Sequence, residues 1–153
     1  MYQTDYSRRC YKNDRQIAIT VIFIDMNLQQ FVPSDQIIIS IAHRVKSKFP
    51  SSNGKCEYMS RSLMEELMEK GIRANHVMGI FTLDEPGAWK YRSEEDESLD
   101  EYSVNHDWVS VEGKILDISA DQFRKYVHKN IPDIVYINYS NPLYTHYNEL
   151  GYA

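Results

Sequence analysis

Three residues in this chain have side chains that together could carry out nucleophilic catalysis: Cys56, His106 and Asp117. Cys56 follows a turn-like run at 51–54 and stands at the start of a predicted helix that ends near Lys70. A helix N-terminus presents unpaired N–H groups and a partial positive charge, which favour the thiolate form of a cysteine and can hold an oxyanion. Cys56 is therefore a candidate nucleophile, and its ordinary alternative is a buried core cysteine.

His106 and Asp117 lie in two predicted strands that are joined by a tight turn. Glu112-Gly113 is a hairpin signal between apolar residues, so strands 102–111 and 114–118 should pair antiparallel. An acid in the middle of an apolar strand is costly to bury unless it has a partner. His106 is the partner that the hairpin offers to Asp117, whereas a half-exposed strand histidine is the ordinary interpretation of His106 alone.

Pairing across this tight turn predicts the register. Val111 then faces Lys114, and Asp117 falls opposite Trp108, one diagonal step from His106. An aspartate in that position can accept a hydrogen bond from one imidazole nitrogen and so fix the tautomer and orientation of the ring. The other ring nitrogen is then available to face a thiol. The pattern predicts a triad in which the imidazole is the base and the carboxylate is its orienting acid.

Two sequence blocks extend this pattern. The first, at 54–60, reads Gly-Lys-Cys-Glu-Tyr-Met-Ser and is followed at 71–74 by Gly-Ile-Arg-Ala. The second, at 105–117, reads Asn-His-Asp-Trp-Val-Ser-Val-Glu-Gly-Lys-Ile-Leu-Asp, and Ala-Asp-Gln-Phe follows at 120–123. Over roughly residues 50–125 the chain resembles the papain-like cysteine protease superfamily, and within it the small bacterial and phage members of the transglutaminase-like branch.

The resemblance implies an α+β fold with a papain/transglutaminase-like core, in which the nucleophile helix packs on a mostly antiparallel sheet. By position it implies that Cys56 is the nucleophile, His106 the base and Asp117 the orienting acid. These are the roles that the residue types and their spacing also suggest.

Two further residues are candidates for contacts with the substrate and its oxyanion. Trp108 matches a position that packs beside the site in the family. Asn53, like Gln29 and Gln30, is a candidate oxyanion donor only because it has an amide side chain and precedes Cys56. We take Trp108 and Asn53 as the candidate substrate-binding and oxyanion residues.

The chain is predicted to form a single domain, 1–153, with a catalytic core at about 34–139. A β-branched run at 17–25 is typical of a central strand. An acidic loop is expected at about 84–101, and the polar tail at 140–153 is expected to wrap the surface or fray. The other elements expected from periodicity are helices at about 34–49 and 120–129 and strands at about 72–82 and 134–139.

Composition argues against several classes of protein. The net charge is −5 and no basic stripe is present that could grip a phosphate backbone, so we expect no nucleic-acid partner. No apolar run approaches the roughly 20 residues that cross a bilayer, and the start of the chain is polar, so we expect neither a membrane span nor a signal peptide. The two cysteines do not make a disulfide framework, and no Cys/His spacing suggests a metal. We therefore expect a cytoplasmic protein without a cofactor.

The reaction expected from these residues is acyl transfer at an amide of a protein or peptide substrate, through a thioester on Cys56. Water as the acceptor would make the enzyme a thiol hydrolase, that is, a protease, an amidase or a glutamine deamidase. Two alternatives stay open, a transglutaminase-type transfer to an amine and a catalytically idle protein-binding module. The sequence also leaves open the oligomeric state and the identity of the substrate.

Overall fold

The structure is a computed structural model that describes residues 33–87 and 100–150 of the chain. Its elements in chain order are α2 (Pro33–Lys46), α3 (Cys56–Glu69), β1 (Ala74–Thr82), β2 (Ser103–Val111), β3 (Lys114–Asp117), the 3-10 helix η3 (Ala120–Tyr126), β4 (Val135–Ile137), the 3-10 helix η4 (Pro142–His146) and β5 (Tyr147–Glu149). The strands form one antiparallel sheet in the order β4-β3-β2-β1-β5, so the fold is α+β as predicted. The predicted strand at 17–25 lies outside the described residues. No helix in the described ranges has the length and apolar character that crossing a bilayer requires.

The turn between β2 and β3 has the backbone that its sequence predicts. Glu112 and Gly113 both adopt left-handed angles, with φ of 53° and 73°, as a tight hairpin that follows the natural twist of its strands requires. The Cα of Val111 pairs with that of Lys114, which confirms the predicted register. β3 therefore runs back along β2 and ends at Asp117.

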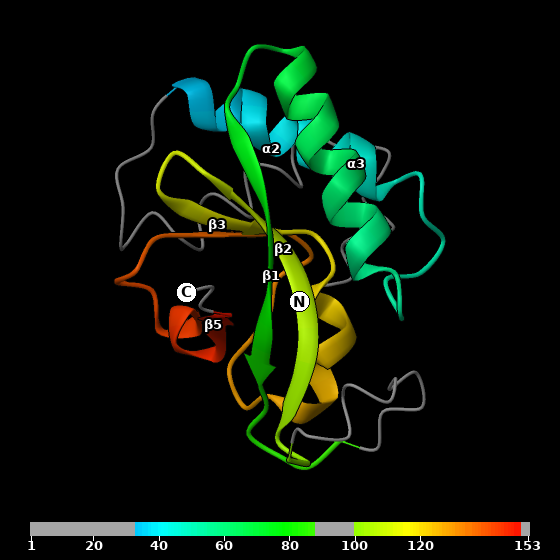
Figure 1. Cartoon of the computed structure of the whole chain (residues 1–153), viewed down its shortest axis with the longest axis vertical. Helices are drawn as coiled ribbons and strands as arrows, with labels where there is room; N and C mark the ends of the chain where they lie inside the picture. The colour runs from blue at the N-terminus through cyan, green and yellow to red at the C-terminus, as the bar shows by residue number, and fades with distance from the viewer. Residues whose placement is uncertain (1–32, 88–99, 151–153) are drawn as a thin grey trace.

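Helices α2 and α3 cover one face of the sheet. Their apolar residues recur at helical spacing, and the recurring positions are buried against the strands. Figure 1 shows the two helices packed together over the same end of the sheet. The core between them and the sheet contains Ile38, Ile41, Ala42 and Val45 of α2, Met59, Leu63 and Leu67 of α3, and Ala74, Val109, Val111 and Leu116 of the strands.

Gly71 ends α3 and turns the chain into β1. Its φ is 78°, its N–H donates to the carbonyl of Met68, and the N–H of Ile72 donates to the carbonyl of Leu67. These two bonds define a Schellman motif, which favours glycine at the left-handed position. The predicted helix end is thereby confirmed, and the motif sets the direction in which β1 leaves α3.

A second buried cluster lies on the opposite face of the sheet, because its strand residues alternate with those of the first. The tail that we expected to wrap or fray supplies part of this cluster. β5 pairs with β1, and Leu143 and Tyr147 are buried. The cluster contains Phe81, Val104, Trp108, Ile115, Phe123, Val135, Ile137, Leu143 and Tyr147.

Candidate active site

His106 and Asp117 form a buried pair at the centre of the site. The imidazole Nε2 of His106 lies 2.7 Å from Oδ2 of Asp117, and both side chains are fully buried. His106 comes from the middle of β2, and Asp117 is the last residue of β3, which the hairpin brings alongside. The neighbourhood that the register predicted for these two residues is therefore confirmed.

The carboxylate of Asp117 is held by donors on both of its oxygens. Oδ2 accepts from His106 and from the hydroxyl of Tyr147, at 2.7 and 2.8 Å. Oδ1 accepts from the backbone N–H and the hydroxyl of Ser119, at 2.9 and 3.2 Å. Burial alone would raise the pKa of Asp117, but the charge of His106 and these hydrogen bonds lower it below its usual value. The carboxylate is therefore ionised, and His106 donates through Nε2 because a carboxylate only accepts.

The ring of His106 is enclosed by aromatic side chains. Phe81 and Phe123 meet it edge-on, with ring centroids 5.7 and 4.8 Å away. Trp108 and Tyr147 lie at 6.0 and 6.4 Å. Burial by these rings lowers the pKa of His106, but the charge and hydrogen bond of Asp117, with a smaller contribution from Cys56, raise it to about 10. The imidazole is thus protonated over the physiological range while it stays inside the protein.

The second ring nitrogen of His106, Nδ1, is the atom through which the pair could interact with Cys56. Nδ1 is buried and has no hydrogen-bond partner of ordinary geometry among the described residues. Even so, the Cys56 side chain contributes, by hydrogen bond and by charge, to the raised pKa of His106. Both observations fit a thiol that lies near Nδ1 without a well-aligned bond, and such loose contacts are common in resting active sites. Cys56 is a free cysteine, and the residue is partly exposed to solvent.

The start of α3 leaves N–H groups available beside the thiol. Gly54 has a φ of 69° and turns the chain into the helix. Lys55 occupies the N-cap position but makes no capping hydrogen bond through its side chain. The N–H groups of Gly54 and Lys55 donate to Gln122 and to the carbonyl of Ser52. The first N–H groups of α3 itself have no partner within the helix, and such groups can stabilise a negative oxygen.

Gln122 joins the turn before Cys56 to the loop that holds Asp117. Its side-chain oxygen accepts from the N–H of Gly54 at 3.3 Å, and its side-chain nitrogen donates to the carbonyl of Ser119 at 2.9 Å. Ser119 in turn binds the Asp117 carboxylate. Figure 1 shows the start of α3, the end of β3 and η3 (gold) meeting beside β2. The three segments that carry the site are therefore tied by one side chain.

The two candidate substrate residues lie in different surroundings, Asn53 at the surface and Trp108 inside the protein. Asn53 has an exposed position, and its backbone N–H donates to the hydroxyl of Ser51 at 3.1 Å. Trp108 is 1% exposed and meets the ring of Tyr147 edge-on at 5.0 Å, so it packs inside the protein and offers no surface to a substrate. The prediction of a packing position beside the site holds for Trp108, but that of a substrate contact does not. Gln29 and Gln30 lie outside the described residues.

Three residues around Asp117 were not assigned to the site from the sequence. Tyr147 lies in a Tyr-rich polar tail, where nothing distinguishes it from its neighbours. Ser119 precedes the expected helix at about 120–129, in the position of a cap, but its side chain makes no capping bond and binds Asp117 instead. The only sequence signal for Gln122 was its place in the Ala-Asp-Gln-Phe segment of the family resemblance.

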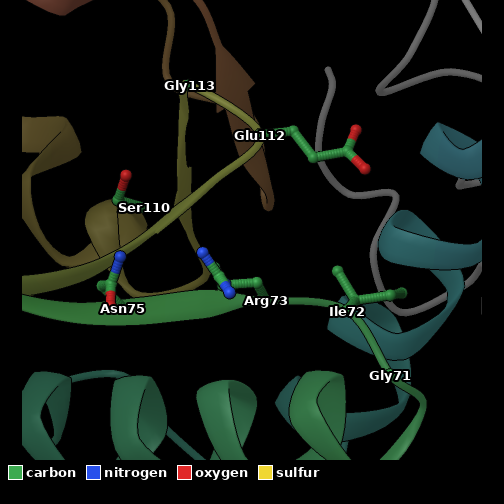
Figure 2. Close-up of a pocket in the computed structure, with 7 residues that line it drawn as sticks. All are labelled: Gly71, Ile72, Arg73, Asn75, Ser110, Glu112 and Gly113. Carbon is green, nitrogen blue, oxygen red and sulfur yellow. The ribbon is translucent and has the colours of Figure 1, made fainter.

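A separate open hollow of about 410 Å³ lies away from these residues. Figure 2 shows Arg73, Asn75 and Ser110 reaching into it from the side of the strands that faces away from α3. Neither Cys56 nor His106 lines this hollow. No three His, Cys, Asp or Glu side chains within 33–87 and 100–150 are placed to hold a metal ion.

Comparison with known proteins found no family model, no curated protein and no solved structure that matches this chain. The arrangement of the side chains is therefore the evidence for what this protein can do. That arrangement consists of an accessible thiol at a helix start, a buried imidazole that carries a proton, and a carboxylate whose oxygens are fully used. Such a set can activate the thiol and later return a proton to a leaving group.

Proposed function

We propose that this protein is a cysteine-dependent acyl-transfer enzyme with a papain/transglutaminase-like core. It acts on an amide of a protein or peptide and transfers the acyl group to water. The observation that carries the proposal is the fully buried His106–Asp117 pair beside a partly exposed Cys56. The second imidazole nitrogen of His106 has no hydrogen-bond partner among the described residues, and the Cys56 side chain contributes to the raised pKa of His106.

In the first half-reaction the Cys56 thiolate attacks the amide carbonyl carbon, and the carbonyl π electrons move to oxygen. N–H groups at the start of α3 stabilise that oxygen. The intermediate collapses as the C–N bond breaks, and the leaving nitrogen takes the proton from Nδ1 of His106. The acyl group remains on the sulfur as a thioester, and Asp117 keeps its bond to Nε2 throughout.

In the second half-reaction a water molecule gives a proton to Nδ1 and attacks the thioester carbon. The C–S bond then breaks, which releases a carboxylic acid and restores the thiolate beside the imidazolium. The same steps with an amine in place of water would give transamidation. We favour water because the chain is small and a partly exposed thiol leaves the thioester open to solvent.

The proposal is tested by looking for the thioester. The protein is incubated with glutamine-containing peptides and denatured casein, and its intact mass is followed. We expect an acyl adduct on Cys56 that hydroxylamine removes, together with released ammonia or new peptide ends. The Cys56→Ser protein should show neither.

Products that persist in the Cys56→Ser protein would refute the mechanism. An added primary amine distinguishes the two acceptors, because the proposal expects the acid to dominate over the amide product. Preferred incorporation of the amine would assign the protein to transamidation instead.

A further inference from the structure

Tyr147 reaches the carboxylate of the site from the other end of the chain. Its hydroxyl donates to Oδ2 of Asp117 at 2.8 Å, and this is the same oxygen that His106 binds at 2.7 Å. Burial, together with the charge and hydrogen bond of Asp117, raises the pKa of Tyr147 well above its usual value. The phenol therefore stays neutral and acts only as a donor.

Packing fixes the ring that carries this hydroxyl. Tyr147 meets Phe81 and Trp108 edge-on, with centroids 5.1 and 5.0 Å away. Its backbone pairs with Phe81 in the sheet. Just before it, His146 binds the carbonyl of Thr82 through Nδ1 and stacks on Phe81. The hydroxyl is thus held in place by β5, a strand of the C-terminal segment.

We propose that Tyr147 is a positioning residue for the His106–Asp117 pair, and this inference rests on the proposed function. A carboxylate at a strand end can rotate about its Cβ–Cγ bond. The Ser119 donors hold one oxygen, and the Tyr147 hydroxyl holds the other in line with Nε2. Because the phenol is neutral, it fixes the carboxylate without replacing the imidazolium as its counter-charge.

The consequence is that the C-terminal strand completes the site. Without the hydroxyl, Oδ2 keeps a single partner in a buried environment, and the carboxylate can turn away from the imidazole. The imidazolium beside Cys56 is then less well supported. The ring itself remains packed in a Tyr147→Phe protein, so this variant removes the hydroxyl and nothing else.

The chain offers a matched control in Tyr136. Its hydroxyl donates to Oδ1 of Asp35 at 2.7 Å, another buried phenol–carboxylate bond in a different core. A Tyr136→Phe protein should lose stability like a Tyr147→Phe protein. It should leave the site unchanged, because Tyr136 belongs to the core under α2 and α3, whereas the rings around His106 belong to the other core.

Two readouts separate positioning from stability. The first is the exchange of the Nε2 proton of His106 with water, measured by NMR. The second is the rate at which iodoacetamide alkylates Cys56 at about pH 6. We expect faster proton exchange and a roughly two- to tenfold slower alkylation in the Tyr147→Phe protein, the effect of one hydrogen bond, and neither change in the Tyr136→Phe protein.

The inference is overturned if Tyr147→Phe behaves as Tyr136→Phe does, with reduced stability and unchanged readouts at His106 and Cys56. Failure of the proposed function looks different. In that case Cys56 of the unaltered protein reacts no faster than an ordinary thiol. The proton exchange of His106 still decides whether Tyr147 positions the pair.

Discussion

At the residue scale, the three groups of the site differ in their contact with water. Cys56 is partly exposed, whereas the side chains of His106 and Asp117 are fully buried. A charge pair in the interior interacts more strongly than one at the surface, but only if its polar atoms are satisfied. The donors on Asp117 meet that condition for the carboxylate, and Nδ1 of His106 is the one atom of the pair that the described residues leave without a hydrogen bond. In the proposed reaction, a substrate would therefore meet Cys56 at the surface while the ion pair stays inside the protein.

The sequence predicted those contacts of the site that depend on residues close together in the chain. Residue types and a hairpin register were enough to place Asp117 next to His106, because both depend on a turn only a few residues away. Tyr147 and Gln122 could not be found in the same way. Their contacts with Asp117 and Gly54 join segments that are distant in the chain and depend on how the whole molecule packs.

The link made by Gln122 leads to a prediction. A Gln122→Ala protein loses the bonds to Gly54 and Ser119, so the turn before Cys56 can move relative to the loop that holds Asp117. We expect alkylation of Cys56 at about pH 6 to slow several-fold, with a loss of about 1–2 kcal/mol in the free energy of unfolding.

A matched control is Gln36→Ala, which changes an exposed glutamine of α2. It should alter neither the alkylation rate nor the stability by a measurable amount. If both variants leave the Cys56 rate unchanged, Gln122 does not align the site.

At the element scale, the site exists because β3 is much shorter than β2. β3 covers four residues and β2 nine, so within 33–87 and 100–150 no strand lies beside the part of β2 beyond Asp117 on that edge. The start of α3 and η3 lie there instead, as Figure 1 shows. A short strand thus opens the space in which a helix start can approach a strand histidine.

Elements that have a strong local sequence signal could be predicted, and elements without such a signal could not. The hairpin and the end of α3 carry strong local signals, Glu112-Gly113 and Gly71, and both predictions are confirmed. β5 covers three residues of a polar tail, and no period can be recognised over so short a stretch. It is a strand because it pairs with the edge of β1 that does not face β2, and the sequence of the tail does not show this.

Gly79 gives a test of how β5 is seated. A Cβ at this position would lie 2.3 Å from Cη2 of Trp108 and 2.6 Å from the carbonyl oxygen of Asn148 in β5. A Gly79→Ala protein must therefore move the indole or the strand. We expect a loss of about 1–3 kcal/mol in the free energy of unfolding, measured by urea denaturation, and a slower reaction of Cys56.

The control is Gly113→Asn, at a turn where a Cβ meets nothing within 4 Å and φ is +73°. Asparagine tolerates this left-handed conformation, so the expected loss is small. A Gly79→Ala protein as stable as the Gly113→Asn protein would show that Trp108 and β5 are not packed as described.

At the scale of the whole molecule, the sheet separates two cores with different tasks. One joins the sheet to α2 and α3, and the other surrounds His106 with aromatic rings. The site is therefore part of a core, and its charge state must contribute to the stability of the fold.

The sign of this contribution follows from the pKa shifts. The pKa of His106 is raised in the folded protein, so its contribution is complete below an unfolded pKa of about 6.5 and is lost as pH rises towards about 10. The pKa of Asp117 is lowered, so its contribution is present above about pH 3.9 and is lost on acidification. Between about pH 3.9 and about pH 6.5 both contributions are present, and the pair stabilises the fold fully.

The prediction is made for the Cys56→Ser protein, in which no thiol ionises beside His106. From about pH 6.5 to about pH 9, the His106 contribution should lower the free energy of unfolding by up to about 1.4 kcal/mol per pH unit. Urea denaturation across this range measures the slope. A protein that also carries Asp117→Asn should lack this part of the slope, and equal slopes in the two proteins would contradict the buried ion pair.

The most direct test of the central claim, that His106 and Asp117 activate Cys56, is the rate of iodoacetamide alkylation at about pH 6, where an ordinary thiol is almost entirely protonated. Peptide mass spectrometry follows Cys56 and Cys10 in the same sample. We predict that Cys56 reacts much faster than Cys10, and that it slows to the rate of Cys10 in a His106→Ala protein whose circular dichroism shows it to be folded. If Cys56 reacts no faster than Cys10, or if its rate does not change when His106 is replaced, the pair does not activate the thiol.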